Sequence, residues 1–254
     1  MGKSVGRALP VTPYRRLVTE LMYASAKVPS VSADRRMDLR PLAAARQICS
    51  PRPSWCGLFA KAFGMVGRDH PELRRSYMKF PWPWIYEHPH NVVSLNIDRA
   101  TAEERIVLYC LIRAPENRSI AEIEELIRSH KEEPLENLRS YKRSVRMANL
   151  PWPIRPLAFW SSLNSNGRRR CHNFGTFGVS SIGALGAGLL SITPILTTSI
   201  HFGMFDEQNR LDVRLSWDHR VMDGAVVAKS LVDLEETLNR EIVRELTGVR
   251  RAAA

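Results

Sequence analysis

The chain has 254 residues, enough for one large domain or two small ones, and 44% of them are hydrophobic, which is ample for a core. Its formal net charge of +11 favours an anionic partner such as nucleic acid, a membrane surface or a phosphate-bearing cofactor, and a soluble basic protein fits the charge equally well. The sequence has no zinc-finger spacing and no RNA-binding signature, so we expect no nucleic-acid partner.

The cysteines have no spacing that indicates a metal site. Cys49, Cys56, Cys110 and Cys171 form no Cys-x-x-Cys pair and no ligand pattern with histidine. We therefore expect reduced thiols and no metal, as in a reducing compartment. The first residues lack the apolar stretch of a signal peptide, so the expected location is the cytoplasm.

The first third of the chain reads as an arm followed by helices and one strand. Residues 1–11 are the expected arm, and Thr12 before Pro13 starts a helix. A strand is expected near Val31 and Ala33, and Asp38 should open a short helix through Leu42. Ser54 caps the next helix, which ends near Gly67 and places His70 in a turn.

The middle of the chain alternates strands with one strongly capped helix. The aromatic stretch Pro81–Tyr86 is expected to pack at an edge. Val93, Leu95 and Ile97 alternate as a strand, and the run 106–112 predicts a strand buried on both faces. Ser119-Ile120-Ala121-Glu122 is a capping box that opens a helix.

Residues 134–170 combine basic and aromatic side chains. They could form a membrane-surface patch or a lid over an acyl chain, but an insertion packed on its own domain or on a neighbouring subunit is favoured. The tract Arg168-Arg169-Arg170 is read as a solvated loop in preference to a phosphate contact. The run 171–205 has no Asp, Glu, Lys or Arg, and its Gly, Ser, Thr and Pro content predicts buried strands and turns, not a transmembrane helix. His201 within it is read as a core histidine.

The last part of the chain contains the most informative motif. Residues 211–217 alternate as a half-buried strand, and 227–246 carry the apolar stripe of an amphipathic helix. His219 follows the strand end, where an imidazole can take and return a proton near neutral pH. Asp223 and Gly224 precede the helix, and the Asp223 carboxylate can cap it or hold a cation. Residues 249–254 are the expected tail.

The string Asp218-His219-Arg220-x-x-Asp223-Gly224-Ala225 resembles the catalytic domain of dihydrolipoyl acyltransferases from 2-oxoacid dehydrogenase complexes, within the chloramphenicol acetyltransferase-like superfamily. The stretch 175–183 resembles that family's Gly-Thr-Phe-Thr-Ile-Ser-Asn-Leu-Gly, with Ser181 in place of Asn. Tyr14-Arg15-Arg16-Leu17-Val18 is similar to its first helix. The resemblance implies an α/β fold, a chloramphenicol acetyltransferase-like two-layer sandwich with a mixed β-sheet that forms trimers. It spans 12–248 as one domain, with 134–170 as a divergent insertion.

The resemblance also assigns roles. His219 would be the general base, and Ser180 of a neighbouring subunit would donate a hydrogen bond to the oxyanion. Arg15 would pair with Asp223, which makes that aspartate structural, and Gly224 would be the turn that starts the helix. Coenzyme A or acyl-coenzyme A would be a substrate, and its binding residues are unassigned because Arg105-Ile106-Val107 replaces the family's Gly-Leu-x-x-Pro element.

Three functions remain open at this point. The first is an acyltransferase that moves an acyl group between coenzyme A and a thiol, hydroxyl or amine. The second is a non-catalytic trimeric or cage-forming core, and the third is an antibiotic-modifying type of acetyltransferase. The expected partners are further copies of the chain, as a trimer or a cage of trimers, and an acyl or lipoyl carrier protein. The chain itself is expected to carry no lipoyl group, and peripheral membrane contact is not favoured.

Overall fold

A six-stranded mixed sheet forms the centre of the computed structural model, which describes residues 6–101, 104–183, 186–187 and 195–252. The strand order is β1-β8-β7-β6-β4-β5, and β6 runs parallel to both β4 and β7 while the other neighbours are antiparallel. Its strands are β1 (Ser30–Asp38), β4 (Val92–Ala100), β5 (Arg105–Arg113), β6 (Phe177–Ser180), β7 (Thr198–Phe202) and β8 (Arg210–Asp218). A separate hairpin pairs β2 (Arg75–Met78) with β3 (Trp84–Glu87).

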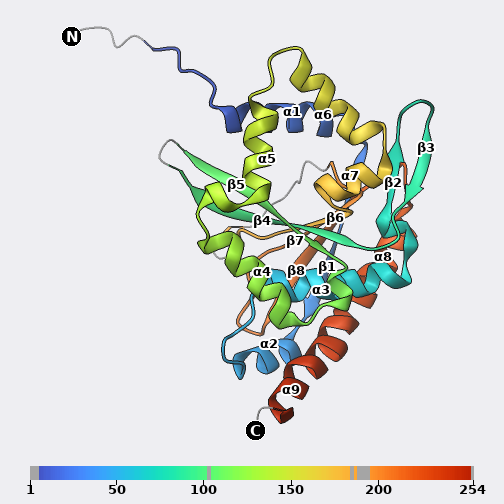
Figure 1. Ribbon diagram of the computed structural model, residues 1–254. Helices are drawn as coiled ribbons and strands as arrows, with labels where there is room; N and C mark the ends of the chain where they lie inside the picture. The colour runs from blue at the N-terminus through green and yellow to red at the C-terminus, as the bar shows by residue number, and fades with distance from the viewer. Residues whose placement is uncertain (1–5, 102–103, 184–185, 188–194, 253–254) are drawn as a thin grey trace.

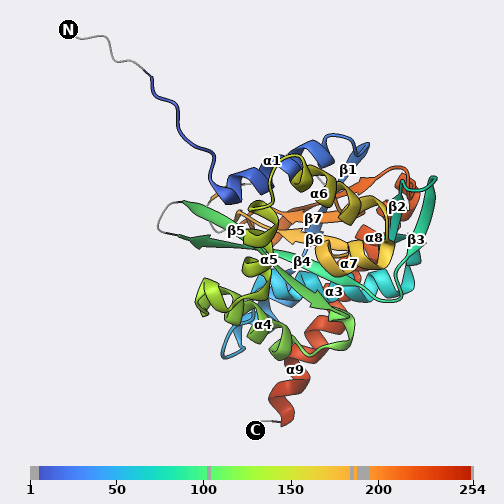
Figure 2. The ribbon, with the colours of Figure 1, turned by 45° about the horizontal axis from the view of Figure 1, so that its top comes forward.

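Helices lie on both faces of the sheet, as Figures 1 and 2 show. One face is covered by α3 (Trp55–Asp69), α4 (Ile120–Glu132) and α8 (Gly224–Thr237), with α2 (Arg40–Gln47) and α9 (Val243–Ala252) beside them. This half is the expected two-layer α/β sandwich. Over part of the opposite face lie α1 (Pro13–Ser25), α5 (Arg139–Ala148), α6 (Ile154–Asn164) and α7 (Gly167–Phe174).

The alternation of side chains along the strands decides which face becomes the core. Successive residues of a strand point to opposite faces. In β6, Phe177 and Val179 therefore join the apolar core with α3, while Gly178 and Ser180 face α1 and α5. The ring of Phe177 meets that of Phe63 from α3 edge-on, with 4.9 Å between centroids. The polar face of the sheet remains available for a site.

The helix starts predicted from capping residues are confirmed. The Thr12 hydroxyl accepts from the Arg15 amide at 3.2 Å, and the Ser54 hydroxyl accepts from the Gly57 amide at 3.1 Å. Ser119 and Glu122 form both bonds of a capping box. One predicted start is wrong: Asp38 is the last residue of β1, paired with Arg210, so the following helix begins at Arg40.

Two further predictions are corrected by tertiary position. The strand β5 is not buried on both faces: its side chains alternate between exposed and buried, and Val107 is 37% and Tyr109 38% exposed. The tract Arg168-Arg169-Arg170 is helical, within α7, and not a loop. The insertion packs on its own domain, since α5 contacts α1 and β5. The helix α9 continues through Ala252, into the range expected as a tail.

The uncharged run contains the end of α7 and the strands β6 and β7, in keeping with buried strands and turns. Residues 184–185 and 188–194 of this run lie outside the described part of the chain. No helix among the described residues is long and apolar enough to cross a membrane.

Candidate active site

The turn after β8 holds His219 at the end of a rigid strand. The backbone amide of His219 donates to the Pro29 carbonyl at 3.0 Å, which ties the turn to the segment after α1. The Trp217 indole donates to the Met222 carbonyl at 3.1 Å and closes the turn from the other side. The side chain of His219 is 46% exposed, and its ring lies 5.9 Å from that of Trp217. The backbone that carries His219 is therefore fixed, and its imidazole remains open to solvent.

Asp218 is the carboxylate that fixes this turn. It is 1% exposed, and it accepts from the Arg220 amide at 3.0 Å and from the Arg220 guanidinium at 2.8 and 2.7 Å. The guanidinium in turn lies 4.2 Å above the ring of Tyr77 in the β2–β3 hairpin. A paired buried carboxylate of this kind specifies one geometry, because leaving either charge unpaired is costly. Sequence reasoning singled out His219 and Asp223 and missed this pair.

Asp223 does not cap the helix as expected. It stands at the N-cap position of α8 but makes no side-chain capping bond. Its carboxylate lies 3.8 Å from His219 Nδ1 and is 87% exposed. A carboxylate beside Nδ1 favours the tautomer with the proton on Nδ1 and leaves Nε2 for a substrate.

The expected ion pair between Arg15 and Asp223 is not formed within the described chain. Arg15 instead reaches Glu104 at 3.4 Å, at the start of β5. The reason is positional, because α1 lies along α5 and β5. Gly224 is the first residue of α8, and an added Cβ there would meet only Trp217 at 3.9 Å, so the turn does not require glycine on steric grounds.

Ser180 ends β6 on the polar face of the sheet. Its register partner is His201 in β7, which is opposite Arg214 in β8, and Arg214 pairs with Asp34. The expectation of a core histidine fits His201, which is 2% exposed. Burial lowers the pKa of His201, opposed by its hydrogen bond to the Ser180 backbone. The backbone of Ser180 is thus held by the buried ring of His201.

The register places Ser180 and His219 of one chain far apart. Ser180 is level with His201 and Arg214, and His219 lies five residues beyond Arg214 along the β8 direction. At about 3.4 Å per residue along a strand and about 4.8 Å between strands, the separation is roughly 20 Å. A base and an oxyanion donor must both come within about 3 Å of the reacting atoms. One chain therefore cannot bring both groups to one substrate.

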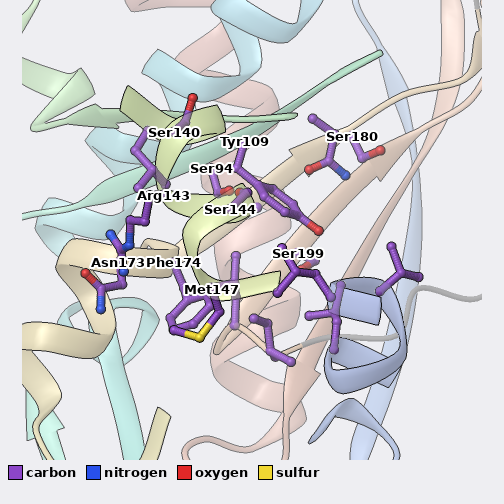
Figure 3. A pocket seen from close by; sticks show the side chains of 18 of the residues that line it. Ser94, Tyr109, Ser140, Arg143, Ser144, Met147, Asn173, Phe174, Ser180 and Ser199 are labelled. Atoms are coloured by element: carbon purple, nitrogen blue, oxygen red, sulfur yellow. The ribbon is translucent and has the colours of Figure 1, made fainter. Parts of the chain in front are cut away.

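A cavity of about 310 Å³ opens beside Ser180, between the sheet and α1, α5 and α7. Figure 3 shows Ser180 at one side of it and Arg143 with Asn173 at the other. The walls are mainly apolar and include Leu17, Leu21, Met147 and Phe174. His219 does not line this cavity, which agrees with its large distance from Ser180 within one chain.

Other candidate chemistry is weak in the described part of the chain. No group of three or more His, Cys, Asp or Glu side chains there could hold a metal ion. All four cysteines are free thiols, and burial raises the pKa of Cys56 to about 11 and of Cys110 to about 12, which leaves these two thiols protonated.

Sequence reasoning also missed the role of Arg170. This side chain is 5% exposed and donates to the carbonyls of Tyr77 at 3.0 Å and Leu163 at 3.3 Å, and to that of Ile195. It therefore joins α7 to the hairpin and to the segment before β7. A run of three arginines in the sequence does not indicate which of them is buried; in the structure Arg168 and Arg169 are exposed and Arg170 is buried.

No family model matches the sequence, and no curated protein matches it. Solved structures do match. A probable dihydrolipoamide acetyltransferase from Listeria monocytogenes gives a TM-score of 0.65 at 17% identity, over 92% of this chain and 95% of that one. The dihydrolipoamide acetyltransferase of Azotobacter vinelandii gives 0.67 at 17%, over 96% and 95%. Chloramphenicol acetyltransferase gives 0.51 at 12%, over 91% and 99%. The chain has the fold of the catalytic cores of 2-oxoacid dehydrogenase acyltransferases, which chloramphenicol acetyltransferase shares.

Proposed function

We propose that the protein is an acyltransferase that moves an acyl group between a coenzyme A thioester and a thiol, hydroxyl or amine acceptor. The observation that carries the proposal is the pairing of two half-sites on one fold: a rigidly held, solvent-open imidazole at His219 and a hydroxyl at Ser180 beside a cavity. The similar folds support it, since those proteins are named as acetyltransferases.

The reaction proceeds by direct attack. His219 Nε2 takes the proton of the acceptor, whose heteroatom forms a bond to the thioester carbonyl carbon. The Ser180 hydroxyl donates to the oxyanion that develops, a contact of the type worth about 3 kcal/mol. The carbon–sulfur bond then breaks, and the departing thiolate takes the proton back from the imidazolium. No covalent enzyme intermediate is needed.

The site is shared between subunits of a homotrimer. The roughly 20 Å between Ser180 and His219 in one chain supports this arrangement, because only a second copy can complete the pair. Two proteins of this fold are described as cores of multienzyme complexes, one of them cubic, which is consistent with trimers that associate further.

Asp223 orients the imidazole in this proposal and does not act on the substrate. The Azotobacter vinelandii enzyme was investigated for the catalytic roles of a serine, a histidine and an asparagine four positions after that histidine. Asp223 stands four positions after His219, near its Nδ1 atom. Replacing Asp223 with Asn keeps a hydrogen-bonding group and should therefore retain more activity than replacing it with Ala.

The decisive experiment measures thiol release from acetyl-coenzyme A and longer acyl-coenzyme A donors, with dihydrolipoamide, other thiols, hydroxyls and amines as acceptors. Wild type should turn over, and His219→Gln should lose about 10²-fold or more in kcat. If the wild type shows neither turnover nor bound coenzyme A, the non-catalytic core protein is the correct function. A monomeric mass in solution would refute the shared site.

A further inference from the structure

The helix α6 of the divergent insertion is apolar on two opposite faces, and only one of them is covered. On the inner face, Phe159 and Leu163 are buried. On the outer face, Ile154, Leu157 and Trp160 follow one another at intervals of three residues, and all three are exposed. A helix that is apolar all round is normally buried all round. The outer face of α6 therefore calls for a partner from outside the described chain.

The tip of the β2–β3 hairpin extends this outer face. The Phe80 amide donates to the Asn164 carbonyl at the end of α6 at 3.1 Å, and the ring of Phe80 meets that of Trp160 edge-on, with 6.0 Å between centroids. In the same tip Trp82 is 70% exposed, and Trp152, in the loop before α6, is 78% exposed. In Figure 1 the hairpin tip and α6 lie at the same upper end of the molecule. We call these side chains the aromatic patch: Phe80, Trp82, Trp152, Ile154, Leu157 and Trp160.

The chain around the aromatic patch carries only positive charge. Residues 137–170 include eight Lys and Arg and no Asp or Glu. The one charged residue of α6, Arg155, pairs with Glu20 of α1 at 3.0 Å, and both side chains are largely buried. The outer face of α6 is therefore uncharged. Exposed cations flank it in the chain: Lys79 at the start of the hairpin tip and Arg146 in the last turn of α5.

We propose that the aromatic patch binds the surface of an anionic phospholipid bilayer. Trp and Phe side chains at loop tips enter the layer between headgroups and acyl chains, and neighbouring Lys and Arg attract anionic headgroups. The proposal is independent of acyl transfer, because no residue of the patch lines the cavity beside Ser180.

A protein partner fits this surface less well. A contact of the patch with itself in a second copy would bring two basic segments together, and like charges oppose such a contact. An acidic protein would match the charge, but protein interfaces use about one hydrogen bond per 100–200 Å². The side chains of the patch offer only indole N–H donors and no acceptor. A bilayer surface requires no such pairing.

Co-sedimentation of the full-length wild-type oligomer with lipid vesicles tests the proposal. The probes are vesicles of phosphatidylcholine alone and vesicles in which part of it is replaced by phosphatidylglycerol. The protein should bind the mixed vesicles at least about tenfold more tightly than the neutral ones at low salt. High salt should reduce the difference to less than about twofold. No binding, or equal binding to both vesicles at low salt, would overturn an anionic bilayer as the partner.

Leu157→Ser tests the patch itself, and Ile48→Ser is the matched control. Ile48 is also an exposed aliphatic residue, but it follows α2 at the opposite end of the molecule (Figure 1). Leu157→Ser should weaken binding to the mixed vesicles by about tenfold, since a leucine side chain no longer leaves water, and Ile48→Ser should weaken it less than about twofold. Equal effects of the two substitutions would overturn the location.

Two further measurements separate the bilayer from other partners. Vesicles with brominated acyl chains should quench the tryptophan fluorescence of the wild type, and the double variant Trp82→Phe/Trp152→Phe should bind but be quenched much less. Unchanged quenching would overturn insertion of the patch. The mass of the oligomer in solution should be the same for the wild type and Leu157→Ser. Dissociation of Leu157→Ser into smaller species would assign the patch to a contact between copies and overturn the proposal.

Discussion

Complementation between two inactive variants should restore activity if the site is shared. Ser180→Ala removes the oxyanion donor and His219→Gln removes the base, so each variant alone should be impaired at every interface. When the two chains are co-expressed equally, an interface is intact only if its serine comes from a His219→Gln chain and its histidine from a Ser180→Ala chain.

The expected magnitude follows from the geometry. In the proposed shared site, Ser180 and His219 come from different chains, because within one chain they are roughly 20 Å apart. With random assortment the two conditions are met independently, so about a quarter of the interfaces are intact in a cyclic assembly. Specific activity in the co-expressed pool should therefore reach about 25% of wild type.

The assay is thiol release from acyl-coenzyme A, normalised to total chain. A pool of Ser180→Ala with the Ser180→Ala/His219→Gln double variant is the control, because it can form no intact interface. Separately purified variants mixed just before the assay should stay inactive until subunits exchange. Activity in the co-expressed pool no higher than in the single variants would refute the shared site.

Three stability predictions follow from buried groups. Burial lowers the pKa of His88 and His201 from the ordinary 6.5, so the unfolded chain binds more protons than the folded one below that pH. The contribution of the two neutral imidazoles to the free energy of unfolding should be complete above about pH 6.5 and should fall as the pH drops through the lowered pKa values. Equal urea midpoints at pH 7.5 and 5.0 would contradict this. Lys61 pairs with Glu245 at 2.6 Å and is 7% exposed, so Lys61→Met should cost about 3 kcal/mol in urea unfolding, whereas Arg244→Met, at an exposed pair, should cost less than about 0.5 kcal/mol. An added Cβ at Gly167 would lie 2.1 Å from Tyr86 Cγ, so Gly167→Ala should lower the free energy of unfolding by about 1–3 kcal/mol. Gly203→Ala is the control and should be nearly neutral, because an added Cβ there meets nothing within 4 Å. Similar thermal midpoints for the two variants would show that the contact with Tyr86 relaxes without cost.

Local signals in the sequence predicted local structure well. Ser54 and the capping box at Ser119 act within three or four residues, so the helix starts could be read directly. The resemblance around Asp218 and Ser180 similarly led to the correct fold. The predicted helix start at Asp38 was wrong because pairing with β8 extends β1 to that residue. The residues near Asp38 do not indicate a strand partner so distant in the sequence.

The candidate site depended on contacts that no local pattern contains. Arg15 meets Glu104 and not Asp223 because the start of α1 lies along β5, where the Val107 amide donates to the Tyr14 hydroxyl. The cavity floor is formed when Ser94 and Ser199 reach the same face from two strands that flank β6. Each serine alone looks like an ordinary strand residue, so the sequence could not indicate that they share a cavity.

The small β2–β3 hairpin contacts both the turn that carries His219 and the start of α7. The ring of Tyr77 lies under Arg220, which fixes the turn that carries His219. On the neighbouring strand of the hairpin, Tyr86 packs against Gly167, the first residue of α7. A shift of this hairpin would therefore displace the turn that carries His219 and the start of α7 together. Substitutions of Tyr77 and Tyr86 should therefore have non-additive effects on kcat and KM, because both residues position segments through the same hairpin.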